Sequence, residues 1–254
     1  FRIFCFYIEY NYILNSIIYL IIELIMYQIS NKIYCPKDIM QLELPTKLLP
    51  NPYYDYPFLI IKDFFSKENL EQLNEILRVD DDVEQAKVRK KDINIINRKV
   101  DKSIRETKIH KLPKEYINLY KKQFMFFQKK IEDYFCLALT TSTKPQVLEY
   151  TKGSFYKAHS DDSNMILKDN KLVGFTTVAH QRRVTTVLFL SDDYTGGELV
   201  FNYLYDENKQ VVKLRANSGD MVVFLSNPIF THEVLEVTSG NRFTLVQWHD
   251  AIIN

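Results

Sequence analysis

Two segments in the first half of the chain carry apolar residues at helical spacing. The first is KENLEQLNEILR, residues 67–78, preceded by Ser66, a residue type that helix N-caps prefer. The second is KEYINLYKKQFMFFQKKIEDYF, residues 114–135. Their apolar stripes consist of Leu70, Leu73, Ile76 and Leu77, and of Ile117, Tyr120, Phe124, Phe127, Ile131 and Tyr134. Each stripe predicts an amphipathic helix.

From Pro145 onward the pattern changes to short β-rich runs. These are QVLEY, SFYKAH, RVTTVLFLS, ELVFNYLY, QVVKL, DMVVFLS, HEVLEV and RFTLVQW. Turn-forming residues separate the runs, among them Gly196-Gly197 and Ser239-Gly240-Asn241. Many short strands at this spacing predict a β-barrel or a double-sheet jelly roll.

The composition is that of a globular protein. The chain has 254 residues, 46% hydrophobic and 26% charged, and a net charge of +1, which gives no global attraction to nucleic acid or membrane. Residues 87–130 carry fifteen Lys or Arg against four Asp or Glu, which we interpret as a solvated face rather than a site for an acidic partner. The three cysteines, Cys5, Cys35 and Cys136, form neither a disulfide framework nor a zinc spacing, so we expect a reducing, cytoplasmic location.

Residues 1–30 are strongly apolar, but Asn11, Asn15 and Glu23 interrupt the run. A membrane-spanning helix is one interpretation, and membrane association stays open. We favour another, in which this stretch precedes the true start at Met26 or Met40. We therefore expect a doubtful extension over 1–30, a linker over 31–56, and a domain over 57–254 with its β core at 145–250. A chain that begins at Met40 should then stay soluble and active.

The segment FYKAHSDDSN places His159 two residues before Asp161. In a strand, residues i and i+2 point to the same face, so the two side chains could bind one metal ion. Asp162 should face away. His232, 73 residues after His159 and at the start of a predicted strand, is the candidate for a third ligand. Two His and one carboxylate with open positions are typical of non-haem Fe(II) oxygenases, and zinc is the rival metal.

Arg242 follows His232 by ten residues, beyond the turn TSGN. Two antiparallel strands joined by this turn should bring the residues together across the ladder. Along RFTLVQW, Thr244, Val246 and Trp248 share the face of Arg242. A buried guanidinium needs an anion, and a cosubstrate that bears a carboxylate would supply it. The alternative is a surface arginine after a turn.

Together, EYTKGSFYKAHSD, RRVTTVLFLSDDYTGGELVF and SGDMVVFLSNPIFTHEVLEVTSGNRF carry a family resemblance. The sequence resembles the 2-oxoglutarate- and Fe(II)-dependent dioxygenases of the prolyl 4-hydroxylase superfamily over about residues 57–248. The His-x-Asp pair, the distal His, and the Arg ten residues later occur in the order of that family. The GGEL motif and the Gly before Arg242 also fall where the family has them.

The resemblance implies an α+β protein with a mostly β core, a double-stranded β-helix (jelly roll) with an N-terminal helical layer. It implies roles for several residues. His159, Asp161 and His232 would bind iron, and Arg242 would bind the distal carboxylate of 2-oxoglutarate. Tyr150 would hydrogen-bond this cosubstrate, Thr185 is a further candidate for binding it, and both Thr185 and Phe189 would face the barrel interior. His110, His180 and His249 match no ligand position.

The same resemblance implies an enzyme that uses Fe(II), 2-oxoglutarate and O2, with ascorbate as a further cofactor, and releases succinate and CO2. The expected substrate is a prolyl or other residue of a peptide or protein, with residues 161–183 as a long loop at the barrel mouth. The alternatives are hydroxylation of a free amino acid or small molecule, and a non-catalytic metal-binding β-barrel module. Nucleic acid is not an expected partner, because the alkylation-repair branch has a second Arg where this chain has Trp248.

Overall fold

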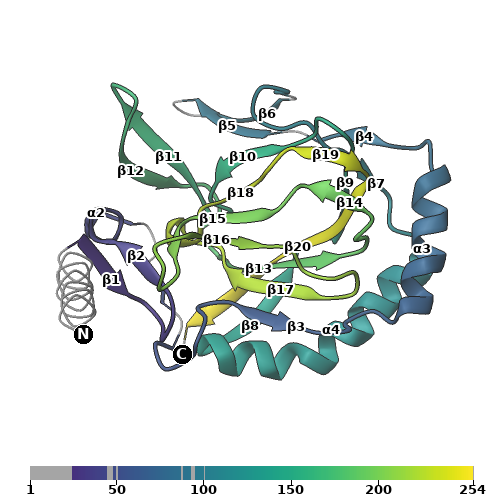
Figure 1. The fold of residues 1–254 in the computed structure, drawn as a ribbon, viewed down its shortest axis with the longest axis horizontal. Helices are drawn as coiled ribbons and strands as arrows, with labels where there is room; N and C mark the ends of the chain where they lie inside the picture. Colours follow the sequence, from purple (N-terminus) through teal and green to yellow (C-terminus); the bar gives the residue numbers. More distant parts are fainter. Residues whose placement is uncertain are drawn as a thin grey trace, which may run out of the picture.

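The computed structural model describes residues 25–44, 48–49, 51–86, 88–92, 95–99 and 101–253. Two antiparallel sheets form the body of the protein (Figure 1). The six-stranded sheet has the order β1 (Met26–Gln28), β2 (Tyr34–Pro36), β15 (Leu199–Tyr205), β18 (His232–Val234) and β10 (Tyr156–His159), with β16 (Val211–Leu214) paired to β15. The eight-stranded sheet has the order β3 (Leu59–Ile61), β17 (Met221–Leu225), β13 (Arg182–Phe189), β20 (Arg242–Ile253), β9 (Gln146–Tyr150), β7 (Lys108–His110) and β4 (Glu84–Gln85), with β8 (Leu137–Ser142) paired to β20.

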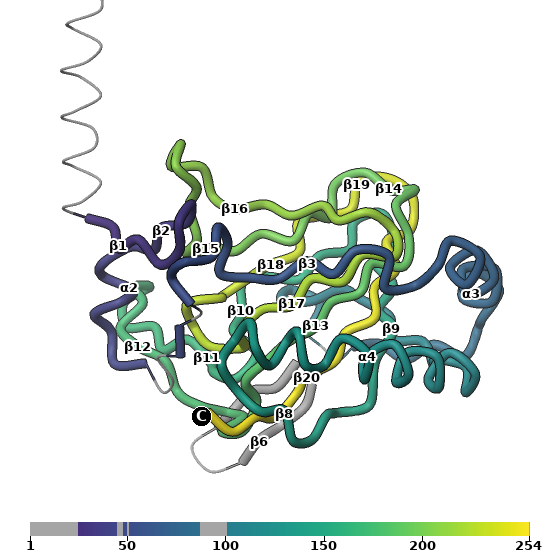
Figure 2. The backbone as a smooth tube through the Cα atoms, turned by 90° about the horizontal axis from the view of Figure 1, so that it is seen from below, coloured from purple at the N-terminus to yellow at the C-terminus, as the bar shows by residue number. Residues whose placement is uncertain are grey.

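The remaining elements lie around these sheets. Three two-stranded ribbons are β11 (Ser163–Lys168) with β12 (Lys171–Thr177), β14 (Tyr194–Gly196) with β19 (Val237–Gly240), and β5 (Val88–Asp92) with β6 (Ile95–Lys99). The helices are α2 (Lys37–Gln41), α3 (Lys67–Val79), α4 (Lys114–Phe135) and the 3-10 turn η1 (Pro228–Phe230). Figure 2 shows β1, β2 and α2 at the opposite end of the molecule from α3.

The core lies where the inner faces of the two sheets meet. Phe201 of the six-stranded sheet and Phe224 of the eight-stranded sheet have their ring centres 5.0 Å apart. Every residue of β17 is buried, and so is β13 from Val184 onward. Such strands read as continuous apolar runs because both of their faces are covered. The mostly β composition and the facing sheets are compatible with the jelly-roll core that the sequence predicted.

Both helices expected from the apolar stripes are present. In α3 the hydroxyl of Ser66 accepts the main-chain N–H of Asn69 at 3.4 Å, as expected of an N-cap. Leu70, Leu73 and Leu77 are buried, but Ile76 is exposed, so its place in the stripe was wrong. In α4 the buried residues are Tyr116, Tyr120, Ile131 and Phe135, and the lysines between them are exposed, which fits a solvated face.

A chain of buried hydrogen bonds links α4 to the eight-stranded sheet. The Tyr120 hydroxyl lies 3.1 Å from the hydroxyl of Thr186, which in turn lies 3.1 Å from Nε2 of His249. Ser142 Oγ lies 2.7 Å from Nδ1 of the same imidazole. Burial lowers the pKa of His249 to about 3, so the ring stays neutral at neutral pH. His249 is therefore a structural residue, as its mismatch with the ligand pattern suggested.

Part of the stretch expected as a doubtful extension belongs to the fold. Ile29 is buried directly after β1, Ile33 is buried directly before β2, and Cys35 is buried within β2. Tyr34 pairs with Tyr205, which joins β2 to the six-stranded sheet. Residues 26–30 of the expected extension therefore contribute β1 and the buried Ile29 to the fold, and the stretch expected as a linker holds β2 and α2. The divisions at residues 30 and 57 stay predictions, and Cys5 lies outside the described residues.

The stretch 161–183 was expected to be a long loop without regular structure. Most of it instead forms the hairpin of β11 and β12, which projects from the body of the protein (Figure 1). Its strands alternate side chains between two faces, and Ile166, Leu167 and Val173 are exposed. Asp169 and Asn170 form the turn with positive φ angles, which these residue types tolerate.

In the parts of the chain that the structure describes, no helix combines the length and apolar character needed to cross a membrane.

The first prediction compares a chain that begins at Met26 with one that begins at Met40. The shorter chain lacks Ile29, Ile33, Cys35 and Ile39, all buried. Fully burying one such side chain contributes about 1.5–3 kcal/mol to the free energy of unfolding. The combined loss is therefore comparable to the whole free energy of unfolding of an ordinary domain. We expect the chain from Met26 to unfold cooperatively, and the chain from Met40 to melt at a much lower temperature or to aggregate. Equal melting temperatures would show that β1 and β2 are dispensable.

Candidate active site

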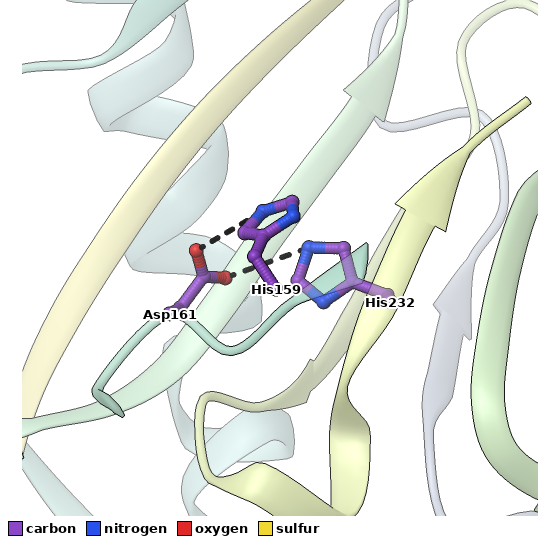
Figure 3. A group of neighbouring side chains, drawn as sticks. All are labelled: His159, Asp161 and His232. Atoms are coloured by element: carbon purple, nitrogen blue, oxygen red, sulfur yellow. Dashed lines mark ion pairs between the residues drawn. The ribbon is translucent and has the colours of Figure 1, made fainter. Parts of the chain in front are cut away.

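His159, Asp161 and His232 lie together at one end of the six-stranded sheet (Figure 3). His159 ends β10 and His232 begins β18, where the two residues are cross-strand partners. Nε2 of His159 lies 3.9 Å from Oδ1 of Asp161, and Nε2 of His232 lies 3.8 Å from Oδ2. The three residues expected to meet are therefore brought together.

The reason we gave for this meeting was partly wrong. Asp161 is not in a strand, because β10 ends at His159 and a bend follows. The bend, rather than the alternation of a strand, turns the carboxylate toward the imidazoles. Asp162 is buried, and its Oδ1 accepts hydrogen bonds from the hydroxyls of Ser160 at 3.2 Å and Ser163 at 2.6 Å. It is not part of the cluster, as the sequence predicted.

Main-chain carbonyl groups orient both imidazoles. Nδ1 of His159 lies 2.9 Å from the carbonyl oxygen of Lys157, and Nδ1 of His232 lies 2.9 Å from that of Phe230. A carbonyl oxygen only accepts, so each Nδ1 carries the proton and donates it. Each Nε2 then keeps its lone pair, directed at the space beside Asp161. Such a partner on the second nitrogen is typical of a metal-binding histidine.

The protonation states suit a cation. Burial, and next the neighbouring His232, lower the pKa of His159 to about 3, so this imidazole is neutral. Burial alone would raise the pKa of Asp161, but the two imidazoles, Arg182 and a hydrogen bond from Thr185 lower it on balance. Neutral imidazoles and an ionised carboxylate are the forms that bind a divalent metal ion.

The donor set fits Fe(II). Its ligand atoms lie within 4.8 Å of one another. It is the one group of His, Cys, Asp and Glu side chains, over the described ranges, that is close enough to hold a metal ion. Two imidazoles and one carboxylate leave open positions on an octahedral ion, as in non-haem iron oxygenases. Catalytic zinc also uses three ligands with an open position, so the donors alone do not exclude it.

Arg242 lies on β20 with an exposed fraction of 1%. Aromatic rings surround its guanidinium carbon, with the ring centres of Tyr150, Phe189 and Tyr194 at 5.0, 5.1 and 6.0 Å. One guanidinium nitrogen donates to the Thr244 hydroxyl at 3.4 Å, and Nε has no partner. Across the described residues no carboxylate forms an ion pair with it. Burying a charge without a counter-ion is costly, so this site is complementary to an anion.

His232 and Arg242 meet by a different route from the one expected. The turn between them leads from β19, not β18, into β20, and β19 pairs with β14 in a separate ribbon. β18 belongs to the six-stranded sheet and β20 to the eight-stranded sheet. The two residues are thus not cross-strand neighbours. They line one inner cavity of about 40 Å³ from opposite sheets.

The other two expected cosubstrate residues also line this cavity. Tyr150 is the cross-strand partner of Arg242, and its ring lies against the guanidinium. The hydroxyl of Thr185 donates to Oδ2 of Asp161 at 2.7 Å and lies 2.8 Å from Oγ of Ser226. Thr185 therefore holds the carboxylate of the cluster. Val246 and Trp248 share the cavity with Arg242, as the alternation of the strand predicted.

An outer cavity of about 410 Å³ adjoins the inner one. Both are lined by Arg105, Tyr156, His159, Asp161 and Trp248. Sequence reasoning missed Arg105 and Arg182, because an arginine in a basic segment or before a strand carries no distinguishing pattern. A larger cavity of about 880 Å³ lies between β3 and β16, and none of the clustered residues lines it.

Comparison with known proteins agrees with this geometry. Residues 145–250 match the model of the 2OG-Fe(II) oxygenase superfamily. This part of the chain is therefore similar to 2OG-Fe(II) oxygenases, in agreement with the resemblance seen in the motifs.

Relatives and solved structures specify the resemblance further. A PKHD-type hydroxylase of Caulobacter vibrioides is 36% identical over 118 residues, 44% of this chain and 45% of the relative. One of Stenotrophomonas maltophilia is 32% identical over 111 residues, 43% and 44% of the two chains. The match thus spans less than half the length of these relatives.

Two solved structures share the fold. A prolyl hydroxylase from Trichoplax adhaerens, in complex with a hypoxia inducible factor oxygen degradation domain peptide fragment, has a TM-score of 0.56 and 19% identity over 76% of this chain and 83% of its own. A prolyl-4-hydroxylase from Pseudomonas putida has a TM-score of 0.50 and 20% identity over 76% and 91%.

The second prediction concerns Gly197 of the GGEL motif. Its φ angle is +67°, and an added Cβ would lie 2.9 Å from Cδ of Arg242 and from Cγ2 of Val237. Gly153, with φ +85° and nothing within 4 Å of an added Cβ, is a matched control. We expect Gly153→Ala to lose about 1 kcal/mol from its backbone conformation alone. Gly197→Ala should lose clearly more in chemical denaturation, and equal losses would refute the contact with Arg242.

Proposed function

We propose that this protein is an Fe(II)- and 2-oxoglutarate-dependent hydroxylase. The observation that carries the proposal is the pairing, across one cavity, of the His159, Asp161 and His232 cluster with the buried and unpaired Arg242. A metal-binding module alone would have no need for a second, cationic end. An iron-bound dicarboxylate satisfies both ends at once.

The three clustered residues would hold iron through Nε2, Nε2 and a carboxylate oxygen. Bound Fe(II) supplies the activation of O2, in which one oxygen atom enters succinate and the other the hydroxyl of the product, with release of CO2. Arg242 would bind the distal carboxylate of 2-oxoglutarate, since its planar fork matches a carboxylate bidentately. Tyr150 packs on that guanidinium and Thr185 donates to Asp161. Tyr150 would thus position the group that binds the cosubstrate, and Thr185 the carboxylate that binds iron.

We further propose a prolyl or other residue of a peptide or protein as the substrate. The outer cavity of about 410 Å³ opens beside the cluster and is large enough for a side chain. The Trichoplax adhaerens neighbour is a prolyl hydroxylase in complex with a peptide fragment, which supports this class of substrate. Hydroxylation of a free amino acid is the second candidate function. We also propose ascorbate as a further cofactor and the cytoplasm as the location of the protein. We also interpret α3 and α4 as the N-terminal helical layer of the family.

The third prediction tests the cosubstrate end. Arg242→Leu should weaken 2-oxoglutarate binding by about a hundredfold or more, because losing one partner of a buried charge pair costs about 3–5 kcal/mol. Arg242→Lys should be intermediate, since it keeps the charge but loses the fork. Anaerobic titration with 2-oxoglutarate measures the affinity, and succinate formation in the presence of Fe(II) and ascorbate measures turnover.

The control is Arg215→Leu, an exposed arginine that stacks on Tyr194 from outside the cavity. It should leave the 2-oxoglutarate affinity unchanged. Unchanged affinity in Arg242→Leu would place the cosubstrate elsewhere. Absence of succinate from the intact protein with every peptide and amino acid offered would favour the non-catalytic module instead.

A further inference from the structure

Two arginine side chains line the outer cavity that opens beside the cluster of His159, Asp161 and His232. Arg105 precedes β7, and Arg182 begins β13. The guanidinium carbon of Arg105 lies 4.5 Å from the ring centre of Tyr156, and that of Arg182 lies 4.4 Å from the ring centre of Trp248. Both rings line the inner and the outer cavity. Stacking on these rings holds the two guanidinium groups in place before any ligand arrives.

Arg105 is a buried cation that forms no ion pair with the part of the chain that the structure describes. Its exposed fraction is 6%, its Nε has no hydrogen-bond partner, and within the described ranges no Asp or Glu forms an ion pair with it. The neighbouring Glu106 pairs with Lys102 instead. Burial of an unpaired charge costs several kcal/mol unless another charge approaches. The position of Arg105 on both cavities means that such a charge can come from a bound molecule.

The other polar groups at this opening include a donor without a partner as well as the amides of Gln85, Gln146 and Asn164, which both donate and accept. The indole Nε1 of Trp248 is buried without a partner, and Arg182 uses one nitrogen to donate to the main-chain carbonyl of Asp161 at 2.6 Å. Besides Asp161, Glu84 is the acidic residue that lines the outer cavity, and it is exposed at the rim, where water screens its charge. Nε of Arg105 and Nε1 of Trp248 are thus the unsatisfied donors at this opening, whereas the carboxylates of Asp161, Asp250 and Asp162 already act on Arg182. Unsatisfied donors are complementary to an acceptor that carries negative charge.

We propose that the substrate presents a carboxylate to Arg105 and Arg182, so that the C–H bond that is hydroxylated lies next to an acidic group. This inference rests on the proposed hydroxylase function and narrows its substrate. Arg242 lines the inner cavity alone, whereas Arg105 also lines the outer one. The two ends therefore serve two different anions. The carboxylate can belong to an acidic side chain beside the target residue of a peptide, or to the α-carboxylate of a free amino acid.

Three peptides with fluorescein on the N-terminal amine, which differ at one position, test for the carboxylate: fluoresceinyl-Ala-Ala-Pro-Glu-Ala-Ala-amide and its Gln and Lys counterparts. Binding to the full chain with Fe(II) and 2-oxoglutarate under nitrogen is measured by fluorescence anisotropy. We expect the Glu peptide to bind about tenfold more tightly than the Gln peptide, since a hydrogen bond to a charged group contributes about 1.5–3 kcal/mol. The Lys peptide should bind most weakly, and added salt should reduce the preference.

Variants of the arginines locate the effect. Arg105→Gln should weaken the Glu peptide about tenfold and leave the Gln peptide within about twofold. Arg182→Gln, at a partly exposed position, gives an independent variant in case the first one folds poorly, and Arg105→Lys should retain part of the preference. Lys102→Gln removes the same charge from an exposed side chain of the same segment and should change nothing.

The outcomes separate the inference from the function on which it rests. Equal binding of the Glu and Gln peptides together with equal succinate formation from L-proline and L-prolinamide would overturn the inference even if succinate forms. So would a loss of 2-oxoglutarate affinity in Arg105→Gln with the peptide preference unchanged. A Glu preference without succinate formation would sustain the carboxylate site and reject the hydroxylase. In a separate arm, faster succinate formation with L-proline than with L-prolinamide, and no Glu preference, would assign the carboxylate to a free amino acid.

Discussion

The constraint on which the rest of the structure depends is a guanidinium group that is buried among aromatic rings and has no carboxylate partner among the residues that the structure describes. Arg242 has an exposed fraction of 1%, and its guanidinium is packed by Tyr150, Phe189 and Tyr194. Gly197 must lack a side chain for Arg242 to fit. Burying this charge without a counter-ion is costly, so the inner cavity is complementary to an anion.

The facing sheets give that ligand its second contact. His159 and His232 project from the six-stranded sheet and Arg242 from the eight-stranded sheet, so the cavity between them has a metal-binding end and a cationic end. Main-chain carbonyls fix both imidazoles, and Thr185 fixes the carboxylate of Asp161. A site oriented in this way by its surroundings needs little rearrangement to bind a cation, which is typical of metal sites in which the second shell sets ligand orientation.

Much of this was readable from sequence because it depends on local pattern. The helices α3 and α4, the β-rich runs, and the meeting of His159, Asp161 and His232 are all present in the structure. What failed depended on tertiary context. The bend that turns Asp161 inward, the assignment of β18 and β20 to different sheets, and the burial of Ile29 beside β1 arise from packing that no short window encodes. Arg105 was invisible for the same reason, since only its burial without a partner distinguishes it.

Anaerobic titration with Fe(II) tests the central claim most directly, because it measures the cluster without assuming a substrate. The matched variants are Asp161→Asn and Asp162→Asn, which each remove one negative charge from adjacent buried carboxylates while keeping an oxygen acceptor. The account predicts one Fe(II) bound per chain in the intact protein and in Asp162→Asn, and a loss of affinity of at least about a hundredfold in Asp161→Asn, in line with the cost of removing a charged ligand. Equal affinities in the two variants would contradict the assignment of Asp161 and, with it, the metal-binding end of the cavity.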